Sequence, residues 1–204
     1  MVRKKSRNVF KIIIIALVFA AVVGLGYSVY NYYQSGAAGG IVVCNPQKPD
    51  ECFWQAHIHT FIVPVACEEE RRLPIESGEL QEIHSHEEKN VLHWHASVPY
   101  DRQKQKIVDK TTLMLGTAFK ELNVEFNSTC FFEKCNDDLC ADGKPGKLKM
   151  FVKRDGRWQQ NFDFEKFVWL DQDVIYLAFD SRADEEILQF LQTSDIRFPV
   201  LGVG

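Results

Sequence analysis

The sequence lacks the short motifs that mark the common enzyme classes. It contains no serine in a nucleophile-elbow pattern, no glycine-rich phosphate loop and no H-E-x-x-H motif. Its cysteines never stand in the C-x-x-C spacing that is typical of a zinc cluster. Any chemistry that the protein performs must therefore be sought in other residues.

An excess of basic residues is also lacking. The 24 Lys and Arg residues face 28 Asp and Glu residues, and the net charge of −4 argues against non-specific nucleic-acid binding, so no nucleic-acid partner is expected. Apolar residues make up 46% of the chain, with 15 Phe and 4 Trp, which is enough for a packed core. After residue 43 there is no low-complexity tract and no second linker. We expect one domain over residues 44–204.

The N-terminus combines basic and apolar segments. Four basic residues within residues 1–10 precede residues 12–29, which carry no charge, and an aromatic segment follows. This pattern predicts a cytoplasmic basic segment at 1–10, a transmembrane anchor at 11–33 and a small-residue linker at 34–43. The remainder would then be an extracytoplasmic domain of a single-pass membrane protein. A cleaved signal peptide is the competing interpretation.

Six cysteines fit an oxidising compartment, where an even number is first interpreted as disulfides. Proximity in the sequence suggests the pairs Cys44–Cys52 and Cys130–Cys140. Cys67 and Cys135 are left to pair or to stay free. The Asn127-Ser128-Thr129 triplet matches the glycosylation pattern, although such short matches also arise by chance.

Hydrophobic periodicity predicts an α+β domain rich in hairpins. One helix is expected to cross the sheet at 109–123, and a C-terminal helix is expected at 183–195. A hairpin is expected around Asp155-Gly156, a dipeptide that favours a tight turn. Further strands are expected at 53–65, 80–86, 91–98 and 173–180, with Asp171 and Asp173 in a turn before the last of these. The order of elements resembles a β-grasp fold at the level of analogy.

All six histidines stand in His-x-His pairs. The pairs are His57 and His59, His84 and His86, and His93 and His95. Side chains at i and i+2 of a strand point to the same face, so each pair delivers two imidazoles to one side of a sheet. A hairpin within "IHSHEEKNVLHWHA" would pair His84 with His93 and turn the mostly apolar set Ile83, Ser85, Leu92 and Trp94 to the opposite face.

This arrangement predicts a site for a transition-metal ion, copper or zinc, since neutral imidazole suits both metals. The predicted ligands are His57, His59, His84, His86, His93 and His95. Glu82 and Glu87 could complete the coordination sphere. Two other interpretations remain open: a pH sensor made of clustered imidazoles, and histidines without a special role.

The first functional hypothesis is metal capture, buffering or handover by a membrane-anchored extracytoplasmic protein. A metalloenzyme with an open coordination position is the second, and a surface assembly module bridged by metal is the third. Binding is favoured over catalysis, because many imidazoles on one sheet face suit binding better than a small cavity. A protein partner is conceivable, but the sequence does not identify one.

Several segments carry a resemblance to other proteins. They are "HIHTFI", "IHSH" with "VLHWHASV", "LGTAFKELNVEFNSTCF", "GKLKMFV" and "LDQDVIYLAF". In these segments the chain resembles a group of membrane-anchored extracytoplasmic proteins of archaea and small-genome bacteria with repeated His-x-His pairs and an NSTC motif. The features shared with the group map onto the six histidines and onto Cys130 and Cys140. The resemblance implies a membrane-tethered extracytoplasmic domain and supplies no activity.

Overall fold

The computed structural model describes residues 13–27, 39–80, 82–85 and 87–199. The chain forms two compact units, residues 1–38 and residues 39–204. The predicted basic segment at 1–10 lies outside the described residues, as does most of the predicted linker at 34–43. The last four residues of the predicted linker form a strand instead. β1 begins at Gly40, because Ile41, Val42 and Val43 pair with a neighbouring strand.

The first unit contains one described helix, at 13–27. A membrane crossing needs about 20 predominantly apolar helical residues. None of the helices in the described part of the chain is long and apolar enough to meet this requirement. This finding overturns the predicted transmembrane anchor at 11–33 and, with it, the single-pass membrane localisation.

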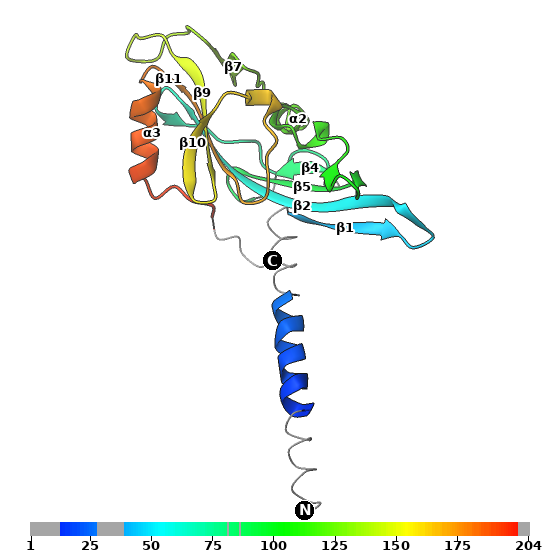
Figure 1. The fold of residues 1–204 in the computed structure, drawn as a ribbon. Helices are drawn as coiled ribbons and strands as arrows, with labels where there is room; N and C mark the ends of the chain where they lie inside the picture. Colours follow the sequence, from blue (N-terminus) through cyan, green and yellow to red (C-terminus); the bar gives the residue numbers. More distant parts are fainter. Residues whose placement is uncertain (1–12, 28–38, 81, 86, 200–204) are drawn as a thin grey trace, which may run out of the picture. The chain divides into compact units, whose positions relative to one another are not determined.

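The second unit is built on one large sheet with helices and short strands at its margins (Figure 1). The sheet contains β1 (Gly40–Asn45), β2 (Lys48–Ala66), β3 (Glu69–Glu70), β4 (Ile83–Ser85), β5 (Val91–Asp101), β6 (Lys106–Ile107), β9 (Lys147–Arg154), β10 (Arg157–Asn161) and β11 (Val174–Asp180). A separate small hairpin is formed by β7 (Cys130–Phe131) and β8 (Lys134–Cys135). The short helical elements are η1 (Thr111–Leu113), α2 (Leu115–Glu121), η2 (Phe164–Lys166) and α3 (Asp184–Thr193).

The strand order is β10-β9-β11-β2-β5-β4. The centre of the sheet is the parallel pair β2 and β11, and the other long strands pair antiparallel. β2 and β11, which lie far apart in the chain, are thus neighbours in the middle of the sheet. The expected hairpin at Asp155-Gly156 joins β9 to β10, with both turn residues at positive φ.

Alternation along β2 decides which side chains face the core. Trp54, Ala56, Ile58, Thr60 and Ile62 are buried on one face. Side chains of the other face, from residue 53 to residue 61, are exposed or half-buried. Because successive side chains of a strand point to opposite faces, this burial pattern fixes the orientation of every residue in β2.

The two α-helices of this unit lie toward opposite ends of the sheet. α2 contacts β4, whereas α3 contacts β10. Ile187 and Leu191 of α3 join a core cluster to which Phe61 and Val63 of β2 add partly buried side chains. α3 therefore covers the half-exposed face of β2 only at the C-terminal part of that strand.

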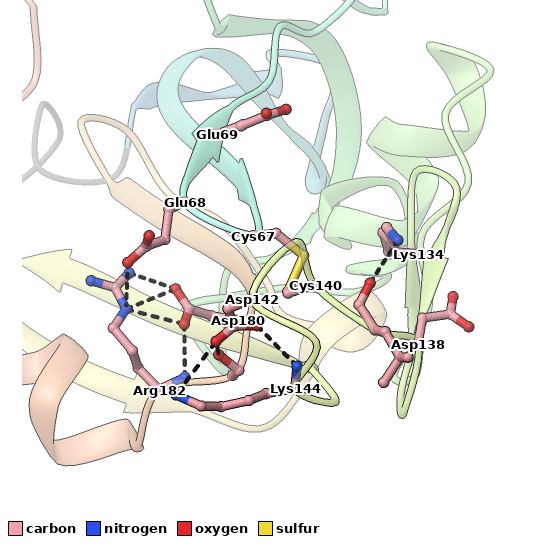
Figure 2. Close-up of a disulfide and its surroundings, with 12 residues drawn as sticks. Cys67, Glu68, Glu69, Lys134, Asp138, Cys140, Asp142, Lys144, Asp180 and Arg182 are labelled. Atoms are coloured by element: carbon pink, nitrogen blue, oxygen red, sulfur yellow. Dashed lines mark hydrogen bonds and ion pairs between the residues drawn. A yellow bond between two sulfur atoms is a disulfide. The ribbon is translucent and has the colours of Figure 1, made fainter.

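Three disulfides stabilise the loops, and one of them corrects the sequence-based prediction. Cys44 is bonded to Cys52, as their proximity suggests. The expected Cys130–Cys140 bond is not formed: Cys130 is bonded to Cys135, and Cys140 is bonded to Cys67 (Figure 2). The physical reason is the β7–β8 hairpin, whose register places Cys130 directly opposite Cys135. Cys140 is then left to connect its loop to the end of β2.

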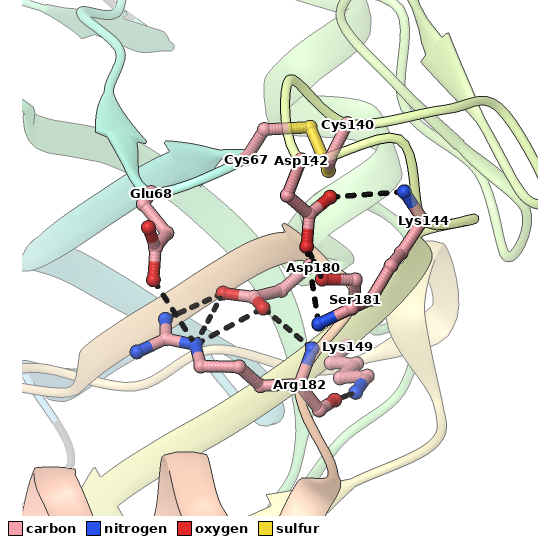
Figure 3. Close-up of polar contacts among 9 residues, drawn as sticks. All are labelled: Cys67, Glu68, Cys140, Asp142, Lys144, Lys149, Asp180, Ser181 and Arg182. Carbon is pink, nitrogen blue, oxygen red and sulfur yellow. Dashed lines mark hydrogen bonds and ion pairs between the residues drawn. A yellow bond between two sulfur atoms is a disulfide. The ribbon is translucent and has the colours of Figure 1, made fainter.

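A polar network surrounds the Cys67–Cys140 bond (Figure 3). Arg182 donates to both carboxylate oxygens of the buried Asp180, with Nε–Oδ1 and Nε–Oδ2 distances of 3.0 Å. Ser181 donates to Asp142 of the cysteine loop at 3.2 Å, and Lys149 donates to the Arg182 carbonyl. The network connects the C-terminal end of β11 to β9 and to the loop of Cys140.

The disulfide that spans the longer stretch of chain is expected to contribute more stability. We predict that Cys67→Ser/Cys140→Ser lowers the free energy of unfolding by about 4 kcal/mol and that Cys130→Ser/Cys135→Ser lowers it by about 2 kcal/mol. The reason is loop-closure entropy, since the sequence separations are 73 and 5. Chemical denaturation of both variants checks this, and equal losses would contradict the account.

Asp180 is expected to make stability depend on pH. Burial tends to raise the pKa of Asp180, but hydrogen bonds from the side chain and backbone of Arg182 lower it, and the net direction is downward. A carboxyl group whose folded pKa is depressed stabilises the protein above its ordinary pKa of about 3.9, and this contribution is lost as pH falls through the folded value.

We therefore predict that Asp180→Asn costs about 1.5–3 kcal/mol at pH 7 and progressively less below about pH 4. Urea denaturation across this range measures the effect. The exposed Asp195 supplies the matched control, and Asp195→Asn should change stability by less than about 0.5 kcal/mol. A loss for Asp180→Asn that is independent of pH would speak against this role.

Candidate metal centre

Three neighbouring strands carry the five described histidines. His57 and His59 lie on β2, His93 and His95 on β5, and His84 on β4. The register places His57 opposite His95 and His59 opposite His93, and His84 is opposite His93 on the other side. Directly opposed residues share a face, so these five imidazoles lie on the same side of the sheet.

The opposite face holds this register in place. Ile58 and Trp94 are directly opposed across β2 and β5 and are completely or almost completely buried. Trp94 also contacts Trp54 at a ring-centroid distance of 5.9 Å. Burying a side chain such as Ile58 stabilises by about 1.5–3 kcal/mol, and a shift of one residue would expose all of these groups. The core therefore forces the histidines onto the accessible face.

The imidazoles form a continuous cluster. The His59 ring lies 4.2 Å from His93 and 4.5 Å from His57, and His57 lies 4.4 Å from His95. The His84 ring is 5.5 Å from His93 and 5.4 Å from His95. We call His57, His59, His84, His93 and His95 the histidine cluster. β5 supplies its middle row, and β2 and β4 supply its two sides.

Within the histidine cluster, three residues have the geometry of a metal site. One ligand nitrogen from each of His57, His93 and His95 lies within 4.8 Å of the others. Two imidazole nitrogens that bind one zinc ion at about 2.1 Å in a tetrahedral site are about 3.4 Å apart. The three residues are called the histidine triad below.

Burial increases from one side of the histidine cluster to the other. His57 is exposed, His59, His93 and His95 are half-buried, and only 2% of the surface of His84 is accessible. The sequence did not predict the burial of His84, which results from an additional segment beside β4. The backbone N–H of Ser85 donates to Ser77, and Glu79 N–H donates to Ile83. Gly78 is required there, since a Cβ on it would lie 2.2 Å from the Ile83 carbonyl oxygen.

A carboxylate that sequence analysis assigned only to a turn also contacts the histidine cluster. Asp171 Oδ1 accepts the backbone N–H of His59 at 2.9 Å and lies 3.5 Å from His59 Nδ1. Both side chains are half-buried. Asp171 precedes β11, and the parallel pairing of β11 with β2 brings the two residues together from 112 positions apart. No local pattern in the sequence signals this contact.

The surroundings favour the form of His57 that can bind a metal. Partial burial lowers the pKa of His57, the neighbouring His59 lowers it further, and Asp171 opposes both effects. The net effect is a lower pKa of His57, so this side chain stays neutral down to a lower pH than a free imidazole does. Neutral imidazole is the form that binds a metal ion.

Other residues expected at the site are not part of the histidine triad. Glu82 and Glu87, proposed as additional ligands, are exposed, and their role as ligands stays a prediction. His86 lies outside the described residues. Asn127 Oδ1 accepts the backbone N–H groups of Thr129 and Cys130, which shapes the turn before β7. Its glycosylation stays a prediction.

A second group brings Glu125, Cys130 and Cys135 within the same 4.8 Å limit. The two cysteines are bonded to each other, however, and a disulfide sulfur is not a thiolate ligand. We therefore assign the metal-binding geometry to the histidine triad.

Comparison with known proteins adds no constraint, because no protein-family model, curated protein or solved structure matches the chain. The geometry of the residues carries the assignment.

The difference in burial predicts different roles in folding for two histidines of the cluster. His84→Ala should lower the free energy of unfolding by about 1–3 kcal/mol, because it removes a buried side chain. The exposed His57 supplies the comparison, and His57→Ala should stay within about 0.5 kcal/mol of the wild type. Denaturation in the presence of a chelator measures both without a contribution from bound metal. Equal losses would show that burial does not separate the two positions.

Proposed function

We propose that this protein binds a transition-metal ion, copper or zinc, through the histidine triad and acts in metal capture, buffering or handover. The observation that carries the proposal is the convergence of ligand nitrogens from His57, His93 and His95 within 4.8 Å. These nitrogens come from two adjacent strands whose register is fixed by the core behind them. A site held by strands needs little rearrangement when the ion binds.

The donor set agrees with these metals. Imidazole nitrogen is a borderline ligand that suits zinc and copper, whereas calcium and magnesium prefer oxygen ligands. Three disulfides are typical of a protein in an oxidising compartment, which fits a function outside the cytoplasm. A metalloenzyme is the second candidate, because three histidines with an open fourth position also describe catalytic zinc sites.

Binding is favoured over catalysis by the surroundings of the triad. A catalytic site usually has a defined cavity that holds the substrate and excludes water. The triad instead lies on an accessible sheet face, and His57 is exposed. An exposed ligand gives an ion or a partner protein direct access, which suits capture and handover.

The proposal predicts that the full-length protein binds Cu(II) or Zn(II) with a dissociation constant in the micromolar range or tighter. His93→Ala removes a triad ligand and should weaken the affinity more than about tenfold. Isothermal titration calorimetry measures the affinity. Ser97→Ala is the matched control, because Ser97 is exposed and follows His93 and His95 on the same face of β5.

Binding should also weaken as the pH falls through about 6.5, because protonated imidazole cannot bind the ion. A wild-type protein that binds neither ion, or equal affinities for His93→Ala and Ser97→Ala, would contradict the proposal. The stoichiometry gives a further distinction. One ion per chain agrees with capture or handover, whereas one ion per two chains would indicate a metal-bridged assembly.

A further inference from the structure

We propose that Asp171 is a positioning residue of the metal centre, which orients His59 so that this residue becomes the fourth imidazole ligand beside the histidine triad. The inference rests on the proposed metal-binding function and extends it. It assigns a role to Asp171 and a role to His59, neither of which belongs to the histidine triad.

The first step is the position of the Asp171 carboxylate. Its Oδ1 atom accepts the backbone N–H of His59 at 2.9 Å, which fixes the carboxylate beside the same residue whose ring it contacts. The His59 carbonyl in turn accepts the N–H of Gln172 at 2.8 Å. The side chain of Asp171 thus binds the backbone N–H of His59, and the following residue, Gln172, binds the backbone carbonyl of His59.

The loop that carries Asp171 is itself held firmly. Thr60 Oγ1 donates to the Leu170 carbonyl, and Leu170 N–H donates to the Asp173 carboxylate. The buried Asp173 is also bound by Arg154, with an Nε–Oδ1 distance of 2.8 Å. Gly39 also packs closely against Asp171, since a Cβ on Gly39 would lie 2.7 Å from the Asp171 Cβ. The carboxylate therefore has little freedom to move away from His59.

The second step is the effect of this carboxylate on the imidazole. Asp171 Oδ1 lies 3.5 Å from His59 Nδ1, and a small ring rotation turns this contact into a hydrogen bond. A carboxylate that accepts the proton of Nδ1 selects the tautomer in which Nε2 carries the lone pair. The same pairing of carboxylate and histidine supports the ligands of many metal sites, where it fixes ring orientation and raises ligand basicity.

The third step is the place of His59 in the histidine cluster. Its ring lies 4.5 Å from His57 and 4.2 Å from His93, so it contacts two of the three triad residues. A zinc ion in a closed site takes four ligands in a tetrahedral arrangement. The ligand nitrogens of His59 are not among those that lie within 4.8 Å of one another, so its ring must turn toward His57 and His93 to supply the fourth ligand, with Asp171 behind it.

The variant that tests this inference is Asp171→Asn in the full-length protein. Asparagine keeps an oxygen that can accept the His59 N–H, but it lacks the charge that holds the Nδ1 proton. We expect Zn(II) affinity to fall about 10- to 100-fold, as is usual when such a supporting carboxylate is removed. Asp163→Asn is the matched control, since it makes the same substitution at an exposed side chain eight positions before Asp171 and should leave the affinity within about twofold.

A double-mutant cycle separates positioning through His59 from a general structural or electrostatic effect. In a His59→Ala background, Asp171→Asn should cause no further loss of Zn(II) affinity. Nitrogen-15 NMR of the metal-free protein supplies a second measurement, in which His59 should have its proton on Nδ1 in the wild type and shift toward the other tautomer in Asp171→Asn.

The outcomes distinguish the two proposals. If the wild type binds Zn(II) but Asp171→Asn binds equally well, the role of Asp171 is wrong and the proposed function stands. A loss that persists in the His59→Ala background, or that Asp163→Asn reproduces, also overturns the positioning role. If the wild type binds neither Zn(II) nor Cu(II), the proposed function itself fails, and the fourth-ligand role fails with it.

Discussion

The pairing of β2 on both of its edges is the constraint on which the rest of the structure depends. On one edge β2 pairs with β5, and on the other it pairs first with β1 and then with β11. Its buried side chains, such as Ile58 and Ile62, fix which residues face the core. The remaining residues of this 19-residue strand must then face the other way, and His57 and His59 are among them.

Each partner of β2 contributes a different part of the candidate metal centre. β5 supplies His93 and His95 opposite the histidines of β2, and β4 extends the same face to His84. The segment before β11 supplies Asp171. The site is thus assembled from four segments, and the hydrophobic core on the reverse side aligns them. Stability and site geometry depend on the same strand register.

The local part of this arrangement could be predicted from the sequence. The two-residue period of the His-x-His pairs and the apolar residues between them were sufficient to predict the pairing of His84 with His93. They also predicted a buried opposite face with Ile83, Leu92 and Trp94. The turn chemistry of Asp155-Gly156 and the hydrophobic periodicity of residues 183–195 likewise predicted elements correctly. All of these signals act between residues that are close in the sequence.

The other parts of the fold and of the candidate site depend on contacts between residues that are far apart in the sequence, and no local pattern predicts such contacts. The contact between Asp171 and His59 requires the parallel pairing of β2 with β11, and a parallel pair is joined by a long connection rather than a tight turn. The Cys67–Cys140 bond likewise joins residues 73 positions apart, so proximity in the sequence suggested the wrong partner for Cys140. The charge-free run at 12–29 predicted a membrane anchor from composition alone, although no helix in the described part of the chain is long and apolar enough to cross a membrane.

The distribution of burial and charge across the histidine cluster bears on how an ion would reach the metal centre and leave it. α3 covers the face of β2 at Phe61 and Val63 but leaves the positions of His57 and His59 accessible. An ion that approaches the proposed site from this side would meet His57 first, and the half-buried His93 and His95 lie on the adjacent strand β5. Asp171 adds a negative charge on this same side, which offsets part of the positive charge of a bound ion. The buried His84 lies on the other side of β5, beside the segment around Gly78, and its ring is 5.5 Å from that of His93 and 5.4 Å from that of His95. At the metal site proposed above, accessible ligands on one side and buried groups on the other would allow the ion to exchange without opening of the fold, as the proposed capture and handover require.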